Sequence, residues 1–182
     1  MKQTNENVSP MSNEGRNTYV IEHITEALIK LLQEKPIGNI TISELCDSAG
    51  IGRASFYRNF ESKEDILKRY ISRETDKWLL ESGKNSFSIN QMDMKHYIVF
   101  LFTHMYKYRN FTDILMKNNK MHLLEAEFDR RFLARLSEHL SPWRIVYNAG
   151  GMYKLFTYWV KTNYEKSPLE LAEIIMDMKS TD

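Results

Sequence analysis

The sequence predicts an all-α fold of about nine helices. Apolar residues recur at spacings of three and four along most of the 182 residues, which is the period of one helix face. Only 7 glycines and 4 prolines interrupt the chain, and no segment alternates apolar and polar residues as a half-buried strand does. Hydrophobic residues make up 42% of the chain, enough to bury a core.

The first helix is expected over residues 17–34, because one apolar stripe runs through this range. The segment 1–16 is polar, and we expect it to be a disordered tail. Pro36 and Gly38 then end the helix. The stripe consists of residues three or four positions apart: Val20, Ile21, Ile24, Ala27, Leu28, Leu31 and Leu32.

Two short helices are expected next, over residues 42–49 and 53–60. Thr41 and Glu44 have the spacing of a capping box, in which each side chain satisfies a backbone donor near the other. Gly50 stands at the turn, where a left-handed backbone favours glycine. Cys46 provides a small side chain where the two helices would cross.

The remaining helices follow from the same spacing. Ser62 with Asp65 predicts a helix start, and that helix is expected to reach residue 80. The segment 82–86 is the clearest loop, and two Ser-Pro pairs mark later helix starts. Beyond the loop we expect helices over residues 92–108, 111–118, 121–139, 143–163 and 168–178.

The two short helices and their tight turn fit a helix-turn-helix. The second helix offers residues suited to DNA, because arginine pairs with guanine edges and hydroxyls and amides bind phosphates. The same pattern also fits an ordinary pair of packed helices. The side chains offered to the outside are Arg53, Ala54, Ser55, Tyr57, Arg58 and Asn59.

Residues 40–67 resemble the DNA-binding domain of the TetR family of bacterial regulators, and the resemblance covers about residues 17–70. Residues 148–172 resemble the end of a subgroup of that family more weakly. The family signature is Thr41-Ile42, Ala49-Gly50-Ile51, Phe56-Tyr57-Arg58, Phe60 and Lys63-Glu64-Asp65-Ile66-Leu67.

The resemblance implies a three-helix head, a long connecting helix and a helical body that binds a ligand and dimerises through its last two long helices. It places Arg53, Ala54 and Tyr57 in the major groove. It places Ser55 and Asn59 on phosphates, and it makes Thr41 and Lys63 clamps on the DNA backbone. Gly52 departs from the family, which often has serine or threonine there.

Aromatic residues and methionines recur at helical spacing in the body, with a few polar tips among them. Ordinary core packing explains most of these residues, and a ligand cavity between helices uses the same composition. We expect a ligand cavity, if the body has one, to lie among these residues and to bind a small apolar or aromatic effector. Its candidate lining is Tyr97, Phe100, His104, Met105, Tyr108, Phe128, Trp143 and Tyr147.

The last two helices carry more large apolar groups than a small body can easily bury, and they carry a glycine pair where a second helix could approach. The alternative is that all of these groups form one intramolecular core. We expect a dimer interface of Val146, Gly150, Tyr153, Phe156, Trp159, Leu171 and Ile175.

Other functional classes find little support in the sequence. Five histidines are scattered without metal-ligand spacing, and no catalytic triad, cofactor motif or metal site is recognisable. No apolar run approaches the roughly 18 residues of a membrane span, and one cysteine suits a reducing cytoplasm. We therefore expect a cytoplasmic protein that is not an enzyme and needs no cofactor.

The sequence thus predicts a sequence-specific transcriptional regulator, a repressor released by a small effector, which binds a palindromic operator in double-stranded DNA as a homodimer. The alternative is a regulator or co-activator of the same fold that responds to a partner protein. The expected organisation is a tail (1–16), a DNA-binding domain (17–65) and a ligand-binding and dimerisation domain (66–182).

Overall fold

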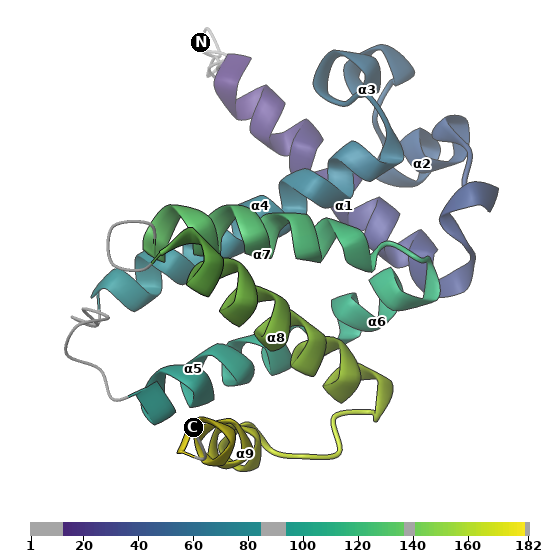
Figure 1. Ribbon diagram of the computed structural model, residues 1–182. Coiled ribbons are helices and arrows are strands. Elements are labelled where there is room, and N and C mark those ends of the chain that lie inside the picture. Colours follow the sequence, from purple (N-terminus) through teal and green to yellow (C-terminus); the bar gives the residue numbers. More distant parts are fainter. Residues whose placement is uncertain (1–12, 85–93, 137–140, 181–182) are drawn as a thin grey trace, which may run out of the picture. The chain divides into compact units, whose positions relative to one another are not determined.

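The computed structural model describes residues 13–84, 94–136 and 141–180, and the chain is all-α there, as predicted (Figure 1). Nine α-helices and one short 3-10 helix form in these residues. They are α1 (Asn13–Glu34), η1 (Ile37–Asn39), α2 (Ile42–Ala49), α3 (Arg53–Asn59), α4 (Lys63–Lys84), α5 (Met94–Lys107), α6 (Arg109–Lys117), α7 (Met121–Leu136), α8 (Pro142–Lys161) and α9 (Pro168–Ser180).

Two helix ends differ by four residues from the expected ones. Helix α1 begins at Asn13, four residues earlier than expected, and the rest of the expected tail lies outside the described residues. Helix α4 continues to Lys84, so the loop expected over residues 82–86 is wrong for its first three positions. An isolated glycine inside a helix costs only about 1 kcal/mol, and Gly83 therefore does not end α4.

The contacts divide the chain into two compact units, one ending at Leu67 and the other beginning at Lys68. In the first unit, α1 packs against α2 and α3. Its core joins the α1 stripe to the two short helices and to the first turns of α4. The most deeply buried side chains are Ile24, Leu28, Ile40, Leu45, Phe56, Ile66 and Leu67.

A side-chain cap defines the start of α2 in the first unit. The Thr41 hydroxyl accepts a hydrogen bond from the Glu44 backbone N–H at 3.1 Å, which is one half of the expected capping box. The Glu44 carboxylate pairs with the Lys35 ammonium and also accepts from the Thr41 backbone N–H, and both hydrogen bonds lower its pKa. This ion pair links the end of α1 to the first turn of α2.

In the second unit, α5 packs against α9 and α7 packs against α8 (Figure 1). The core lies between α5, α8 and α9, where large apolar side chains meet. Phe102 meets the ring of Trp159 edge-on at 5.3 Å, and the Trp159 indole N–H donates to the Lys166 carbonyl at 2.7 Å. Trp159 is therefore fixed within this unit.

The structure corrects part of the expected dimer interface. Four of its residues are buried in the core of their own unit and are not available to a second copy. Both faces of α8 are rich in apolar residues, so the sequence alone did not reveal which face turns inward. The four residues are Phe156, Trp159, Leu171 and Ile175.

Candidate nucleic-acid interface and ligand cavity

Helices α2 and α3 form a compact helix-turn-helix. Gly50 has a φ of +65°, so the turn uses the left-handed backbone that glycine adopts at little cost. The Ile51 N–H donates to the Cys46 carbonyl at 2.9 Å, which closes the last turn of α2. Gly52 then begins α3 without a side-chain cap.

Cys46 of α2 is only 1% exposed. Burial raises the pKa of its thiol, so the side chain stays protonated at neutral pH. It behaves as a small apolar residue in the core of the first unit. Leu45 of α2 and Phe56 of α3 belong to the same core and are fully buried.

The outward face of α3 carries four exposed residues of the predicted DNA-binding set: Arg53, Ala54, Tyr57 and Arg58. Arg53 and Tyr57 are four residues apart and therefore share one side of the helix, and Tyr57 is 65% exposed. Within the described residues, neither the Arg53 guanidinium nor the Tyr57 hydroxyl has a hydrogen-bond partner. Both groups can therefore bind an external ligand at no cost to internal bonds.

The remaining polar residues of α3 are partly engaged in the helix itself. The Ser55 hydroxyl accepts from Arg58 at 3.3 Å, and the Asn59 side-chain amide donates to the Ser55 carbonyl at 2.8 Å. The Thr41 hydroxyl accepts from Glu44 and keeps its own proton for a further partner. Of these three residues, Asn59 is the most committed to local structure.

Lys63 lies in an environment that the sequence did not indicate. Its ammonium donates to the Ile37 carbonyl at 2.5 Å and also to the Ile40 carbonyl. These two carbonyls belong to η1 and to the residue that follows it, so Lys63 ties the start of α4 to the segment between α1 and α2. The role expected for Lys63, a clamp on phosphate, would have to use its third N–H.

The second unit contains a cavity of about 150 Å³ between α4, α5, α6, α7 and α8. Its wall is mostly aromatic and aliphatic. Five residues of the predicted lining contribute to it: Tyr97, His104, Met105, Tyr108 and Phe128. The other lining residues are Tyr70, Ile71, Glu74, Thr75, Trp78, Leu79, Leu101, Phe111, Thr112, Leu124, Glu127, Arg131, Tyr153 and Phe156.

Three residues of the predicted lining lie elsewhere. Phe100 does not line the cavity, and its ring stacks on that of Trp78 with centroids 5.8 Å apart. Trp143 and Tyr147 are 86% and 82% exposed, so they face away from the unit. Conversely, Tyr153 and Phe156 were expected at the dimer interface and line the cavity instead.

The contribution of α4 was missed at the sequence level. Tyr70, Glu74 and Trp78 are four residues apart, which places them on one face of α4. That spacing indicates one face of the helix, but it does not show that a face with a glutamate in the middle lines a cavity. The Tyr108 hydroxyl explains the exception, because it donates to Glu74 at 3.0 Å.

The charged groups of the cavity wall are paired with one another. Burial by itself raises the pKa of Glu74, but hydrogen bonds from Lys77 and Tyr108 outweigh it and lower the pKa. The Arg131 guanidinium binds Glu127 at 2.8 Å and Asp76 of α4 at 2.5 Å. These hydrogen bonds raise the pKa of Arg131 and connect α7 to α4 beside the cavity.

His104 is the wall residue whose ionisation the structure changes most. Burial, reinforced by the positive charge of Lys107 and opposed by Glu74, lowers its pKa to about 4. The neutral ring stacks on Trp78 with centroids 4.9 Å apart and lies 4.9 Å from the Tyr108 ring. Within the described residues, no other group donates to or accepts from its nitrogens.

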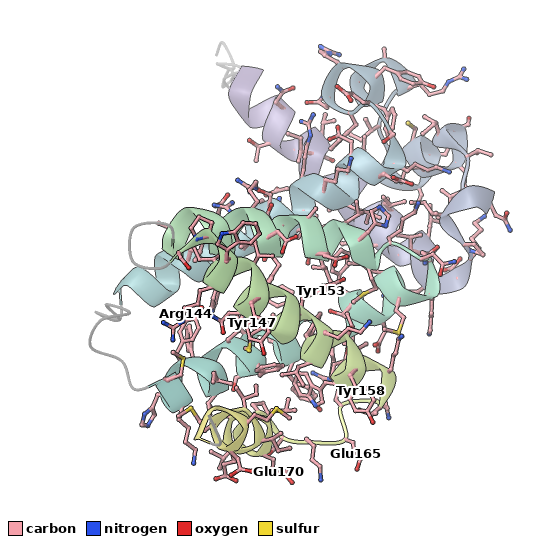
Figure 2. The ribbon with its side chains drawn as sticks, in the orientation of Figure 1. Arg144, Tyr147, Tyr153, Tyr158, Glu165 and Glu170 are labelled. Carbon is pink, nitrogen blue, oxygen red and sulfur yellow. The ribbon has the colours of Figure 1, made fainter. Side chains whose placement is uncertain are left out.

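The outer face of α8 is an exposed stripe of apolar, aromatic and small residues with one lysine among them, which we call the α8 stripe. Figure 2 shows Tyr147 and Tyr158 along this helix. At the two glycines in the middle of the stripe, an added Cβ atom would meet no other atom within 4 Å. The stripe consists of Trp143, Val146, Tyr147, Gly150, Gly151, Lys154 and Tyr158.

Neither a membrane span nor a metal site emerges from the described parts of the chain. Among their helices, none combines the length and the apolar character that crossing a bilayer requires. In the same residues, no three histidine, cysteine or carboxylate side chains come together as metal ligands would.

Comparison with known proteins points to a single family. Residues 24–70 match the family described as bacterial regulatory proteins, tetR family. An uncharacterized HTH-type transcriptional regulator of Bacillus subtilis, YxbF, is 23% identical over 172 residues, which cover 86% of this chain and 44% of the relative. The chain spans less than half the length of the curated relatives it matches.

Solved structures share the fold. Lin0861 from Listeria innocua superposes with a TM-score of 0.75 at 16% identity, covering 95% of this chain and 96% of that one. The transcriptional regulator FadR from Bacillus subtilis, in complex with stearoyl-CoA, has a TM-score of 0.56 at 14% identity, covering 86% and 96%. At these identities the likeness extends to the fold alone.

Proposed function

Because this chain belongs to the TetR family of bacterial helix-turn-helix regulators, we propose that it represses transcription as a homodimer on a palindromic operator. In this proposal, binding of a small molecule in the cavity of the second unit releases the protein from DNA. The observation that carries the proposal is the outward face of α3, where Arg53 and Tyr57 are exposed and uncommitted to internal hydrogen bonds.

Recognition of bases is assigned to α3. Arg53 would pair with a guanine edge, Ala54 would contact a thymine methyl group, and Tyr57 would contact the adjoining base or sugar. The Thr41 hydroxyl and the exposed Arg58 would bind phosphates and set the register of the helix. Asn59 and Lys63 are weaker candidates than the sequence suggested, since both already bind backbone carbonyls.

Contacts with the DNA bases have to supply much of the affinity for the operator. The net charge of the chain is only +1, so a general attraction to the phosphate backbone is weak. Residues 51–70 hold five basic and three acidic side chains, which is a modest local excess. We therefore expect a small non-specific component and a strong dependence on the operator sequence.

The effector would act through α4. This helix carries Glu74 and Trp78 in the cavity wall, and its Asp76 is bound by Arg131 of α7. A molecule that enters the cavity would move these side chains or hold them more firmly. It would thereby bias the position of α4, the helix that leads to the helix-turn-helix. Differential binding to the two positions of α4 is what would couple effector to DNA.

The test is a selection of genomic fragments with the purified chain, followed by binding assays with and without effector candidates. Recovery of palindromic fragments supports the proposal, and a reporter gene then decides between repression and activation. Failure to recover any fragment, with stable binding of a partner protein instead, would favour the alternative of a protein-responsive regulator.

A further inference from the structure

The size of the cavity limits its occupant. At about 150 Å³, it matches cavities that hold one benzene-sized molecule and is smaller than the roughly 300–1,000 Å³ of pockets for drug-sized ligands. A long acyl chain would fill this space with only a fraction of its length. One ring with a short substituent fits it best.

The walls favour a flat molecule. Trp78 of α4 and His104 of α5 stack with an interplanar angle of 27°, and both line the cavity. Phe128 of α7 and Tyr153 of α8 bring a second pair of rings, with centroids 6.3 Å apart. Aromatic faces and edges attract another aromatic ring more strongly than an aliphatic chain of equal area.

The charges in the wall disfavour an ionised ligand. Glu74 is held by Tyr108 and Lys77, and Arg131 is held by Glu127 and Asp76. A charged ligand would have to break one of these pairs to find a counter-ion, or else remain buried without one.

One wall residue has an unused donor. The Nε1 atom of Trp78 is buried and has no hydrogen-bond partner among the described residues. A buried N–H left unpaired is costly, and an acceptor on a ligand would remove that cost. The neutral His104 ring beside it can supply a second polar contact.

We propose, resting on the effector site proposed above, that the cavity selects an uncharged single-ring aromatic molecule carrying a hydrogen-bond acceptor, which Trp78 binds through its indole N–H. The molecule lies against the ring of Trp78, and a rotation of that ring brings Nε1, which has almost no accessible surface in this structure, within reach of the acceptor. The donor thus sets specificity within a site whose apolar walls supply most of the affinity.

Four probes test this assignment by titration calorimetry on the full chain without DNA. Acetophenone has the ring and the acceptor, ethylbenzene has the ring alone, benzoate adds a charge, and decanoate replaces the ring by a chain. We expect acetophenone to bind roughly fivefold or more tightly than ethylbenzene, with benzoate and decanoate weaker than both.

The Trp78→Phe variant isolates the donor, because it keeps an aromatic ring against His104. We expect it to weaken acetophenone about tenfold and to leave ethylbenzene unchanged within about twofold. Trp143→Phe is the matched control, since Trp143 is exposed on α8 and its variant should bind every probe as the natural chain does. Far-ultraviolet circular dichroism checks that both variants remain folded.

Tighter binding of decanoate or benzoate than of acetophenone would overturn the ligand class, as would an equal effect of Trp78→Phe on acetophenone and ethylbenzene. Absence of binding by all four probes at millimolar concentration would overturn it too. These results are independent of DNA. If the selection recovers no operator and acetophenone still binds through Trp78, the proposed function fails and the ligand class stands.

Discussion

At the residue scale, His104 makes stability depend on pH. Its pKa in the folded chain is about 4, below the ordinary 6.5, because the neutral ring is buried against Trp78. Below pH 6.5 the unfolded chain takes up a proton that the folded chain does not. The stabilisation is therefore complete above about pH 6.5 and is lost as the pH falls towards 4.

We predict that His104→Phe removes this dependence. The variant keeps a ring against Trp78 and cannot titrate, so its free energy of unfolding should fall less than that of the natural chain between pH 7 and pH 4.5. The difference should be on the order of 2 kcal/mol in urea titrations, since one pKa unit corresponds to about 1.4 kcal/mol. Parallel pH curves for the two proteins would show that His104 ionises freely in the folded state.

At the scale of elements, the start of α4 is held by Lys63. The ammonium satisfies the Ile37 and Ile40 carbonyls, and hydrogen bonds to a charged group contribute about 1.5–3 kcal/mol. We predict that Lys63→Met lowers the free energy of unfolding by about 1–3 kcal/mol, because the aliphatic stem remains and the donors are lost. Chemical denaturation measures the change.

Lys68→Met is the control for this effect, since Lys68 is exposed on the same helix. Its variant should be as stable as the natural chain. If Lys63→Met leaves stability unchanged and only flattens the salt dependence of DNA binding, Lys63 is the phosphate clamp that the family resemblance implied.

Helix α3 should carry the reading of bases. We predict that Arg53→Ala weakens operator binding by roughly 1–3 kcal/mol and relaxes the preference at one base pair in each half-site. Binding assays on operators mutated at single positions measure both effects. Lys30→Ala, on the exposed side of α1, should bind like the natural chain. An unchanged sequence preference in the Arg53 variant would contradict the placement of α3 in the major groove.

At the scale of the whole molecule, the proposed dimer depends on the α8 stripe. One recognition helix reads too few base pairs to select a genomic site, so two heads on half-sites about one helical turn apart are expected. The stripe is the largest exposed apolar feature of α8, and its glycine pair leaves room for another backbone. A two-fold contact through this surface would bury Trp143 and Tyr147.

We predict that Tyr147→Glu yields a monomer that has lost operator affinity while both units stay folded, because Tyr147 is exposed and makes no core contact. Sedimentation velocity at micromolar concentration measures the state of assembly. Leu80→Glu, an exposed apolar residue of α4, is the control and should remain dimeric. Full operator affinity of a monomeric natural chain would exclude the dimer. Phe156 is unsuitable for this test, since a charge there would disrupt the core.

Local features were predictable because they depend on residues within about one helical turn. The helix period, the Thr41 cap, the Gly50 turn and the outward residues of α3 all follow from neighbours three or four positions apart. The two Ser-Pro starts belong to the same group, with Ser141 accepting from the Arg144 N–H. For these elements the sequence predicted the local structure, and the DNA contacts assigned to them stay predictions.

The cavity and the choice of surfaces were decided by tertiary structure. Phe156 and Tyr147 lie on the same apolar helix, and only packing against α5 and α9 determines that the first is buried and the second is exposed. Lys63 reaches a carbonyl 26 positions away, and the cavity unites side chains from five helices. The sequence by itself determined an all-α fold with a helix-turn-helix, because short-range spacing encodes helices and caps. Tertiary structure assigned the cavity wall and the α8 stripe, because burial depends on partners that are distant in the chain.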